Sequence, residues 1–388
     1  MDKVRIMKIY LLKLLTLFLI IYSLNSCRNP IFYTVTQETP LIPPLIDGSP
    51  SNFVEYNKAL HVASGNNIFK YGINNQSECK WSKMDLSNEK LGNYIVSLAA
   101  TDNSLYVHYL GNNSSGIRRF NEKDGNSSVG INLQLIQSIY AYKNILFICI
   151  RNSDTYTINY LYENDPSVIK EVTDSKSTSV LIGVASDNKY YYLCTYSGIF
   201  YVEIGNIDSS SALPLKEEDK IITGFTGIIN LNDNYVAAIT KNGDLYEIND
   251  TAITKKASFN DSRESTGALG IWKDKDLTKS LLLVGRNEYY YSTISRYTNG
   301  YVEIELDNTG RIKDGAKFND EPGKGPTTSI EDYDRYVSSL GKKIINHFIQ
   351  APSTIDPKMI LFCSTQKNGV WSYRDHGDDE GVTWNAEK

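Results

Sequence analysis

The residues best suited to chemistry in this chain are five cysteines and four histidines, and their spacing forms no reactive pattern. His61, His108, His347 and His376 are scattered, with no HxH, HxxxH or HExxH spacing, and no pair of cysteines has the spacing of a zinc site. The nucleophile signature GxSxG and the nucleotide-binding signature GxGxxG are also missing. The sequence therefore predicts no catalytic residue, no metal ligand and no cofactor, and we expect a protein that is not an enzyme.

One cysteine, Cys27, directly follows an export signal. Residues 1–8 are basic, and Ile9 to Tyr22 form an apolar run broken only by Lys13 and Thr16. This run is shorter than the roughly 20 residues that span a bilayer, which favours a cleaved signal peptide over an uncleaved membrane anchor.

The residues before this cysteine, Leu24-Asn25-Ser26-Cys27, resemble the lipobox of bacterial lipoproteins, although Asn25 stands where a small or β-branched residue is commoner. The resemblance implies that residues 1–26 are removed and that Cys27 becomes a lipidated first residue, carrying diacylglycerol on its sulfur and a further acyl chain. Several acyl chains, at about 0.8 kcal/mol per buried methylene, anchor a protein stably to a membrane.

Residues 27–50 are rich in proline and show no helical period, which predicts an extended tether. The apolar stretch from Ile31 to Gln37 leaves open a second interpretation, a strand that closes a sheet. Arg28 and Asn29 lack the acidic residue that retains some lipoproteins in the inner membrane, so we expect a lipid-anchored protein of the outer membrane that faces the periplasm. A location on the cell surface is the alternative.

The composition favours a folded β-protein with protein partners over one that binds nucleic acid. Of 388 residues, 41% are hydrophobic, and 28 Tyr against 4 Met favour half-buried, pleated surfaces over helix bundles. The formal net charge of −5 makes nucleic acid an unsuitable main partner.

Residues 51–388 repeat one pattern, an apolar strand, a polar turn that usually contains glycine, and a second strand rich in tyrosine. Examples are Ile145 to Arg151 followed by Tyr156 to Leu161, and Tyr190 to Tyr196 followed by Gly198 to Ile204. Seven copies at a mean spacing of about 48 residues match the blades of a propeller. We therefore predict an all-β fold, a seven-bladed β-propeller over 51–388, with eight or six blades as alternatives.

The segment 329–340 departs from this rhythm and predicts a short inserted helix. Ser329 is a candidate N-cap, and Ile330, Tyr333, Val337 and Leu340 form one apolar stripe at helical spacing. Such a stripe packs on the propeller or covers one of its faces.

The last copy of the repeat ends in a sharper motif, in which Asp, Gly, Thr and Trp follow one another at fixed spacing: Asp379, Gly381, Thr383 and Trp384. This resembles the Asp-box, or BNR repeat, of sialidase-like propellers, with Gly377 in place of the usual Ser. The resemblance implies a structural motif in which the aspartate binds turn amides and the tryptophan packs between blades. Near the other end, Trp81 is retained from a degenerate copy, as a closed ring would require.

Three of the remaining cysteines fall at similar places in three different repeats, FICIR, YLCTY and LFCST. The even number left after Cys27 would also allow disulfides in an exported protein. Because separate blades would hold Cys149, Cys194 and Cys363 farther apart than the roughly 4.4–6.8 Å between Cα atoms that a disulfide needs, we interpret them as buried apolar thiols.

These features favour a non-enzymatic, membrane-anchored scaffold that binds envelope proteins. The chain is similar in size, lipid anchor and predicted fold to the propeller lipoprotein of the outer-membrane β-barrel assembly machinery, which implies that complex as a partner. The alternatives are a surface lipoprotein that binds host or environmental ligands and, less favoured, a glycan-active enzyme. The Arg-Ile-Pro type motif of sialidases does not occur.

Overall fold

The computed structural model describes residues 45–73, 78–86, 94–111, 115–121, 128–131, 133, 135–259, 264–274, 279–287, 300–319, 340, 343–375 and 382–387. The chain divides into two compact units, residues 1–43 with Lys388 and residues 44–387, and every described residue belongs to the second. The predicted helix at 329–340, apart from Leu340, lies outside the described residues.

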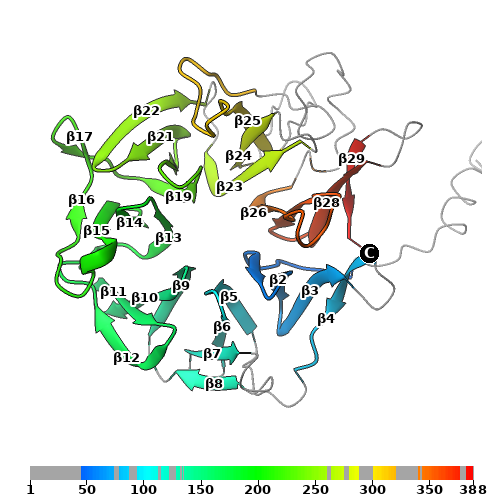
Figure 1. Ribbon diagram of the computed structural model, residues 1–388, viewed down its shortest axis with the longest axis horizontal. Helices are drawn as coiled ribbons and strands as arrows, with labels where there is room; N and C mark the ends of the chain where they lie inside the picture. The colour runs from blue at the N-terminus through cyan, green and yellow to red at the C-terminus, as the bar shows by residue number, and fades with distance from the viewer. Residues whose placement is uncertain are drawn as a thin grey trace, which may run out of the picture. The chain divides into compact units, whose positions relative to one another are not determined.

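The described residues form seven antiparallel sheets arranged in a ring, the blades of a β-propeller (Figure 1). Blade 1 contains β1 (Val54–Tyr56), β2 (Ala59–Ser64), β3 (Asn67–Ile73) and β4 (Cys79–Lys83). Blade 2 contains β5 (Tyr94–Ala100), β6 (Ser104–Leu110), β7 (Ser115–Asn121) and β8 (Ser128–Ile131). Blade 3 contains β9 (Ile136–Tyr142), β10 (Ile145–Asn152), β11 (Thr155–Tyr162) and β12 (Asp165–Glu171).

The remaining blades follow in chain order. Blade 4 contains β13 (Leu181–Ser186), β14 (Tyr190–Thr195), β15 (Gly198–Glu203) and β16 (Leu213–Pro214), and the turn η2 (Ile204–Asn206) follows β15. A small hairpin, β17 (Lys216–Glu217) and β18 (Lys220–Ile221), leads to blade 5, with β19 (Phe225–Asn230), β20 (Val236–Thr240), β21 (Asp244–Asn249) and β22 (Ala252–Ser258). Blade 6 is described by β23 (Ser265–Lys273), β24 (Ser280–Arg286) and β25 (Tyr301–Glu305). Blade 7 contains β26 (Ile345–Gln350), β27 (Leu361–Thr365), β28 (Val370–Asp375) and β29 (Val382–Ala386).

The predicted all-β, seven-bladed propeller is confirmed, which excludes six or eight blades. The two-strand pattern seen in the sequence corresponds to the second and third strands of a blade. The second strands are buried almost throughout, as β10, β14 and β20 show, because each lies between two neighbouring sheets. That burial explains their continuous apolar sequences.

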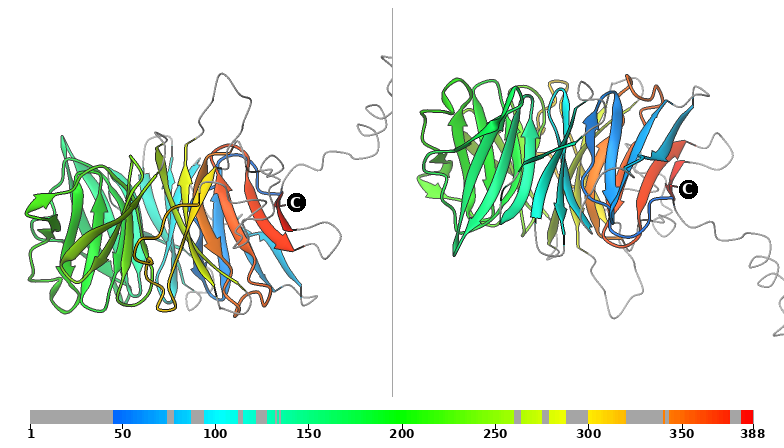
Figure 2. Two further views of the ribbon diagram at one scale, coloured as in Figure 1. Left: turned by 90° about the horizontal axis from the view of Figure 1, so that it is seen from above. Right: turned by 90° about the horizontal axis from the view of Figure 1, so that it is seen from below.

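The first strand of each blade lies nearest the axis, and the chain reverses at two opposite faces of the disc (Figure 2). We call the face with the turns between first and second strands, such as 57–58, 102–103 and 143–144, the turn face. We call the opposite face, where the chain enters each first strand and where second and third strands join, the entry face. No helix among the described residues is long and apolar enough to cross a bilayer.

The hydrophobic core lies between blades, and it contains the three cysteines that the sequence places in strands. Cys149 belongs to the cluster between blades 3 and 4, Cys194 to that between blades 4 and 5, and Cys363 to that between blades 6 and 7. All three are buried free thiols, as predicted. The three positions are not fully equivalent. Cys149 and Cys194 occupy the same pairing position relative to the first strand of their blade, whereas in blade 7 Ser364, not Cys363, occupies that position. Cys363 therefore faces the preceding blade rather than the next one.

The first strands converge so closely that two of them touch backbone to backbone. A Cβ atom on Gly227 of β19 would lie 2.1 Å from the carbonyl oxygen of Gly267 in β23, and one on Gly267 would lie 2.0 Å from the carbonyl oxygen of Thr226. Gly267 also has a φ of +83°, which L-residues with side chains rarely adopt. Blades 5 and 6 can approach in this way only because both positions are glycine.

Elsewhere, side-chain amides in or just before a first strand join neighbouring blades. In three places among the described residues, one carboxamide makes two hydrogen bonds to the backbone of a single residue in the adjacent blade. Its oxygen accepts from that residue's N–H and its nitrogen donates to the same residue's C=O, as a paired strand would. These amide clasps are Asn52 on Leu98, Asn230 on Ser186 and Gln350 on Lys273.

The ring is closed by the segment immediately before β1. The N–H of Leu45 donates to the carbonyl of Glu387, and the N–H of Val370 donates to the carbonyl of Ile46, whose side chain is fully buried between blades 7 and 1. Phe53 N–H then reaches Nδ1 of His347 in β26 at 3.4 Å. Residues 45–53 thus bridge the first and last blades, while the 31–37 strand considered from the sequence lies outside the described residues.

Substitution of Gly227 by alanine tests the backbone contact between blades 5 and 6. We expect Gly227→Ala to lower the free energy of unfolding by about 1–3 kcal/mol, because neither backbone can move without separating the blades. Gly205→Ala is the matched control, since no atom lies within 4 Å of its added Cβ. Urea denaturation measures both, and a Gly227→Ala midpoint equal to that of the parent protein would contradict the contact.

Candidate functional site

The predicted site residues fall mainly outside the described part of the chain. Cys27, Asp379 and Gly381 lie outside it, and Thr383 is described only as part of the backbone of β29. Trp384 is 1% exposed; its ring centroid lies 6.0 Å from that of Tyr301 in blade 6, and its Nε1 donates to the Tyr301 hydroxyl at 3.3 Å. The indole therefore fills the space between blades 6 and 7.

Trp81 occupies the corresponding position in blade 1. It lies opposite Tyr71 across β3 and β4, as Trp384 lies opposite Tyr373 across β28 and β29. Trp81 contacts Phe362 of blade 7, with ring centroids 5.3 Å apart. Both tryptophans thus pack against the preceding blade, so their role in the described structure is to join blades.

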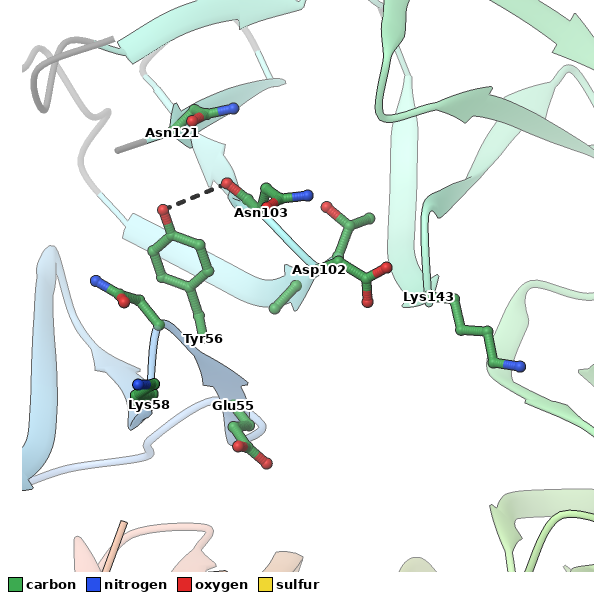
Figure 3. Close-up of a pocket in the computed structure, with 10 residues that line it drawn as sticks. Glu55, Tyr56, Lys58, Asp102, Asn103, Asn121 and Lys143 are labelled. Carbon is green, nitrogen blue, oxygen red and sulfur yellow. Dashed lines mark hydrogen bonds between the residues drawn. The ribbon is translucent and has the colours of Figure 1, made fainter. Parts of the chain in front are cut away.

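The turn face carries a polar pocket of about 510 Å³ where blades 1, 2 and 3 meet. Figure 3 shows Glu55, Lys58, Asp102 and Lys143 around it, and the Tyr56 hydroxyl donates to the carbonyl of Asn103 at 3.5 Å. The charged groups come from the first strand of blade 1 and from the first turns of all three blades.

A buried carboxylate fixes the shape of this pocket. Glu163, in the β11–β12 turn of blade 3, accepts hydrogen bonds from Thr101 Oγ1 at 2.6 Å, from Asn103 N–H at 2.9 Å and from Asn103 Nδ2 at 3.2 Å. Burial acts to raise the pKa of Glu163, but these hydrogen bonds outweigh it and hold the pKa below its ordinary value. Glu163 therefore remains a carboxylate at neutral pH and ties blade 3 to the first turn of blade 2.

The chemistry available in the pocket is recognition by charge and hydrogen bonding. Two carboxylates, Glu55 and Asp102, lie near two ammonium groups, Lys58 and Lys143, and burial raises the pKa of Glu55. The pocket lining contains no cysteine or histidine. Such a mixed-charge surface suits a polar loop of another protein.

The entry face differs, because exposed apolar side chains gather on it over three consecutive blades. Tyr94 and Leu110 form one cross-strand pair in blade 2, Leu135 precedes β9 in blade 3, and Tyr196 and Ile221 lie at blade 4. Each is between 44% and 57% exposed. Exposed apolar groups that share one face of the disc can be buried together against a partner, whereas single scattered ones need no such explanation.

Three of the four histidines lie in strands of blades 1, 2 and 7. His61 and His108 are buried, and His347 lies in β26 beside Phe53. Burial lowers the pKa of each to about 4. His376 lies outside the described residues, and the described part of the chain contains no group of three His, Cys, Asp or Glu side chains arranged to hold a metal ion.

Comparison with solved structures identifies the fold alone. No protein-family model and no curated protein sequence matches the chain. The extracellular domain of a protein assigned to the hybrid two-component systems of B. thetaiotaomicron aligns with 85% of this chain at 12% identity and a TM-score of 0.54. This chain spans only 39% of the length of that one.

Two further solved structures have a similar fold at a similarly low sequence identity. YCF48 bound to a D1 peptide aligns with 87% of this chain and 96% of its own, at 10% identity and a TM-score of 0.52. The β-propeller domain of Cps50 (Swd1) from Myceliophteria thermophila aligns with 90% of this chain and all of its own, at 8% identity and a TM-score of 0.51. The chain is thus similar in fold to a solved β-propeller domain, and its class as a seven-bladed β-propeller follows from the sheets described above.

Neither of these surfaces is predicted by the sequence analysis above. A signal for the turn face exists, since Asn recurs with Lys or Asp in the first turns, as in Asn57-Lys58, Asp102-Asn103 and Lys143-Asn144. No sequence pattern marks Glu163, which acts on a neighbouring blade 60 or more residues away.

Acid should destabilise the fold through its buried histidines. The unfolded state takes up protons near the ordinary histidine pKa of 6.5, whereas His108 stays neutral in the folded state down to about 4. Stability is therefore complete above pH 6.5 and is lost as the pH falls toward 4, by about 1.4 kcal/mol per pH unit for each such histidine.

The substitution His108→Leu isolates one of these contributions, because neither ring nitrogen of His108 has a hydrogen-bond partner among the described residues. We expect unchanged or higher stability at pH 8, and a shallower loss of stability between pH 6.5 and 4. Urea denaturation at several pH values measures this, and identical pH dependence in the two proteins would refute it.

Proposed function

We propose that this protein is a non-enzymatic scaffold of the bacterial cell envelope that binds other proteins through the faces of its propeller. The observation that carries the proposal is the gathering of exposed apolar side chains on the entry face of blades 2, 3 and 4. Burying such a surface against a partner is favourable by about 25 cal/mol per Å² removed from water. The mixed-charge pocket on the turn face offers a second, more polar contact.

The proposed cellular location is inferred from the N-terminal sequence. The basic segment, the short apolar run and Cys27 together support export, lipidation at Cys27 and attachment to the outer membrane on its periplasmic side. The similarity to an extracellular domain of a bacterial two-component system is consistent with a propeller that works outside the cytoplasm.

The partner that we propose is the outer-membrane β-barrel assembly complex. Support comes from the combination of a lipid anchor, a tether and a propeller of this size. A solved structure with a similar fold, YCF48, is bound to a D1 peptide, which supports peptide binding by this architecture. Binding of external ligands at the cell surface remains the competing function.

Crosslinking in intact cells tests this proposal. After crosslinking, detergent extraction and affinity isolation, we expect mass spectrometry to recover the β-barrel insertase and its companions. The control is Cys27→Ala, which should release the protein from membranes and abolish these crosslinks. If no envelope protein is recovered reproducibly, the proposed scaffold function is overturned. If the Cys27→Ala protein still partitions into the detergent phase, the proposed lipid anchor is overturned.

A further inference from the structure

We infer that residues 45–48 form a releasable strap, and that a pull on the chain ahead of Leu45 opens the propeller ring between blades 7 and 1, at the entry face. We call these four residues the strap. Attachment at Cys27, as proposed above, would supply such a pull. The release itself does not rest on the proposed function, because it depends only on contacts between described residues.

The first strands of blades 7 and 1 are joined less closely than those of the other neighbouring blades. Other neighbouring first strands run closely alongside each other, whereas β26 and β1 do so only slightly. The chain just before β1 connects to β26 through the hydrogen bond from Phe53 N–H to Nδ1 of His347, which at 3.4 Å is long. Closure of the ring therefore depends on contacts farther from the axis.

At the turn face, the 351–358 turn of blade 7 holds blade 1. The Tyr71 hydroxyl donates to the carboxylate of Asp356, and Cys79 Sγ donates to the carbonyl of Ile355 at 3.2 Å. These contacts do not involve the strap. They can therefore keep the turn-face end of the two blades together while the entry-face end separates.

At the entry face, the strap lies between blade 7 and blade 1. Ser64, at the end of β2, donates a hydrogen bond from its hydroxyl to the carbonyl of Asp47. Three backbone hydrogen bonds join the strap to blade 7: Leu45 N–H to the Glu387 carbonyl at 3.1 Å, Val370 N–H to the Ile46 carbonyl at 3.3 Å, and Gly369 N–H to the Gly48 carbonyl at 3.0 Å. The strap thus links both blades at this end.

One side chain of the strap contributes to the core. Ile46 is fully buried and belongs to one apolar cluster with Leu60 of blade 1 and Phe362 of blade 7, whereas Leu45 is 42% exposed. A pull on the preceding chain reaches Leu45 and Ile46 before it reaches β1. Because segments with few buried contacts open at a lower free energy than the whole fold, we expect the strap to detach first.

Blade 7 has room for the strap only because residue 369 is glycine. A Cβ atom added to Gly369 would lie 2.1 Å from the carbonyl oxygen of Ile46, and Gly369 has a φ of +74°. Substitution of Gly369 therefore displaces the strap without changing any residue of the strap.

Hydrogen–deuterium exchange of the full-length protein, resolved to single amides, tests the release. In Gly369→Ala we expect Val370 N–H to exchange about tenfold faster or more, as expected for the cost of such an overlap. Ser186 N–H, held by Asn230 between blades 4 and 5, should keep the rate of the parent protein. Ile46→Ser should give the same pattern.

The matched control is Gly65→Ala. Gly65 also lies in a turn between second and third strands and has a φ of +61°, but no atom lies within 4 Å of its added Cβ. It therefore carries a similar backbone cost without displacing the strap, and Val370 should exchange as in the parent protein. An equal effect of Gly65→Ala, or Val370 and Ser186 exchanging together in Gly369→Ala, would overturn the inference.

Single-molecule pulling between residues 27 and 168 tests the effect of load. We expect a first step of roughly 30 Å, as residues 45–53 come away at about 3.3–3.6 Å per extended residue, before the rest unfolds. Gly369→Ala should lower the force of this step and Gly65→Ala should not. Unfolding of the parent protein in a single step would overturn the inference. Failure to crosslink an envelope partner would overturn the proposed function and leave the strap unaffected.

Discussion

Seven first strands converge on one axis in this protein, and their close approach sets the positions of everything farther out. Where two backbones meet, as at Gly227 and Gly267, no Cβ atom fits, and elsewhere a carboxamide such as that of Asn230 takes the place of a strand partner. Residues 45–53 complete the ring by joining β28 and β29 to blade 1. The turns of neighbouring blades lie side by side only because these contacts hold their first strands together.

The two faces of the disc acquire different chemistry from this arrangement. On the turn face, Glu163 reaches from blade 3 to the first turn of blade 2, and charges of both signs surround the pocket there. On the entry face, apolar side chains are exposed on blades 2, 3 and 4. Each surface combines residues from consecutive blades whose turns are separated in sequence, so the propeller holds short polar turns of different blades on one face.

Much of the fold could be predicted from the sequence, and the physical reason lies in burial. Second strands such as β10 and β14 lie between two sheets, so their apolar runs are continuous and recognisable. First strands such as β13 and β19 contain a glycine and a register shift near their start. Both interrupt the alternation of apolar and polar residues, so these strands are hard to recognise in the sequence. Trp81 and Trp384 were recognisable because large rings are needed between the blades that they join.

The surfaces could not be predicted, because they depend on which turns become neighbours. Nothing near Leu135 in the sequence indicates that Tyr196 lies on the same face of the disc. Their common face follows from the stacking of blades 3 and 4 and from single contacts such as that of Ser177 with Ser197. A sequence can therefore indicate a propeller without showing which exposed residues of different blades lie together.

The central claim is that the entry face, more than the turn face or the outer edge, contacts a partner protein. Its most direct test is photo-crosslinking in living cells, with a photoreactive amino acid placed at Tyr196, at Asp102 on the turn face, or at Val168 on the exposed outer strand β12. The account predicts one strong adduct with an envelope protein from position 196 and a weaker or different one from the other two positions. Adducts from Val168 or Asp102 alone, with none from position 196, would contradict it.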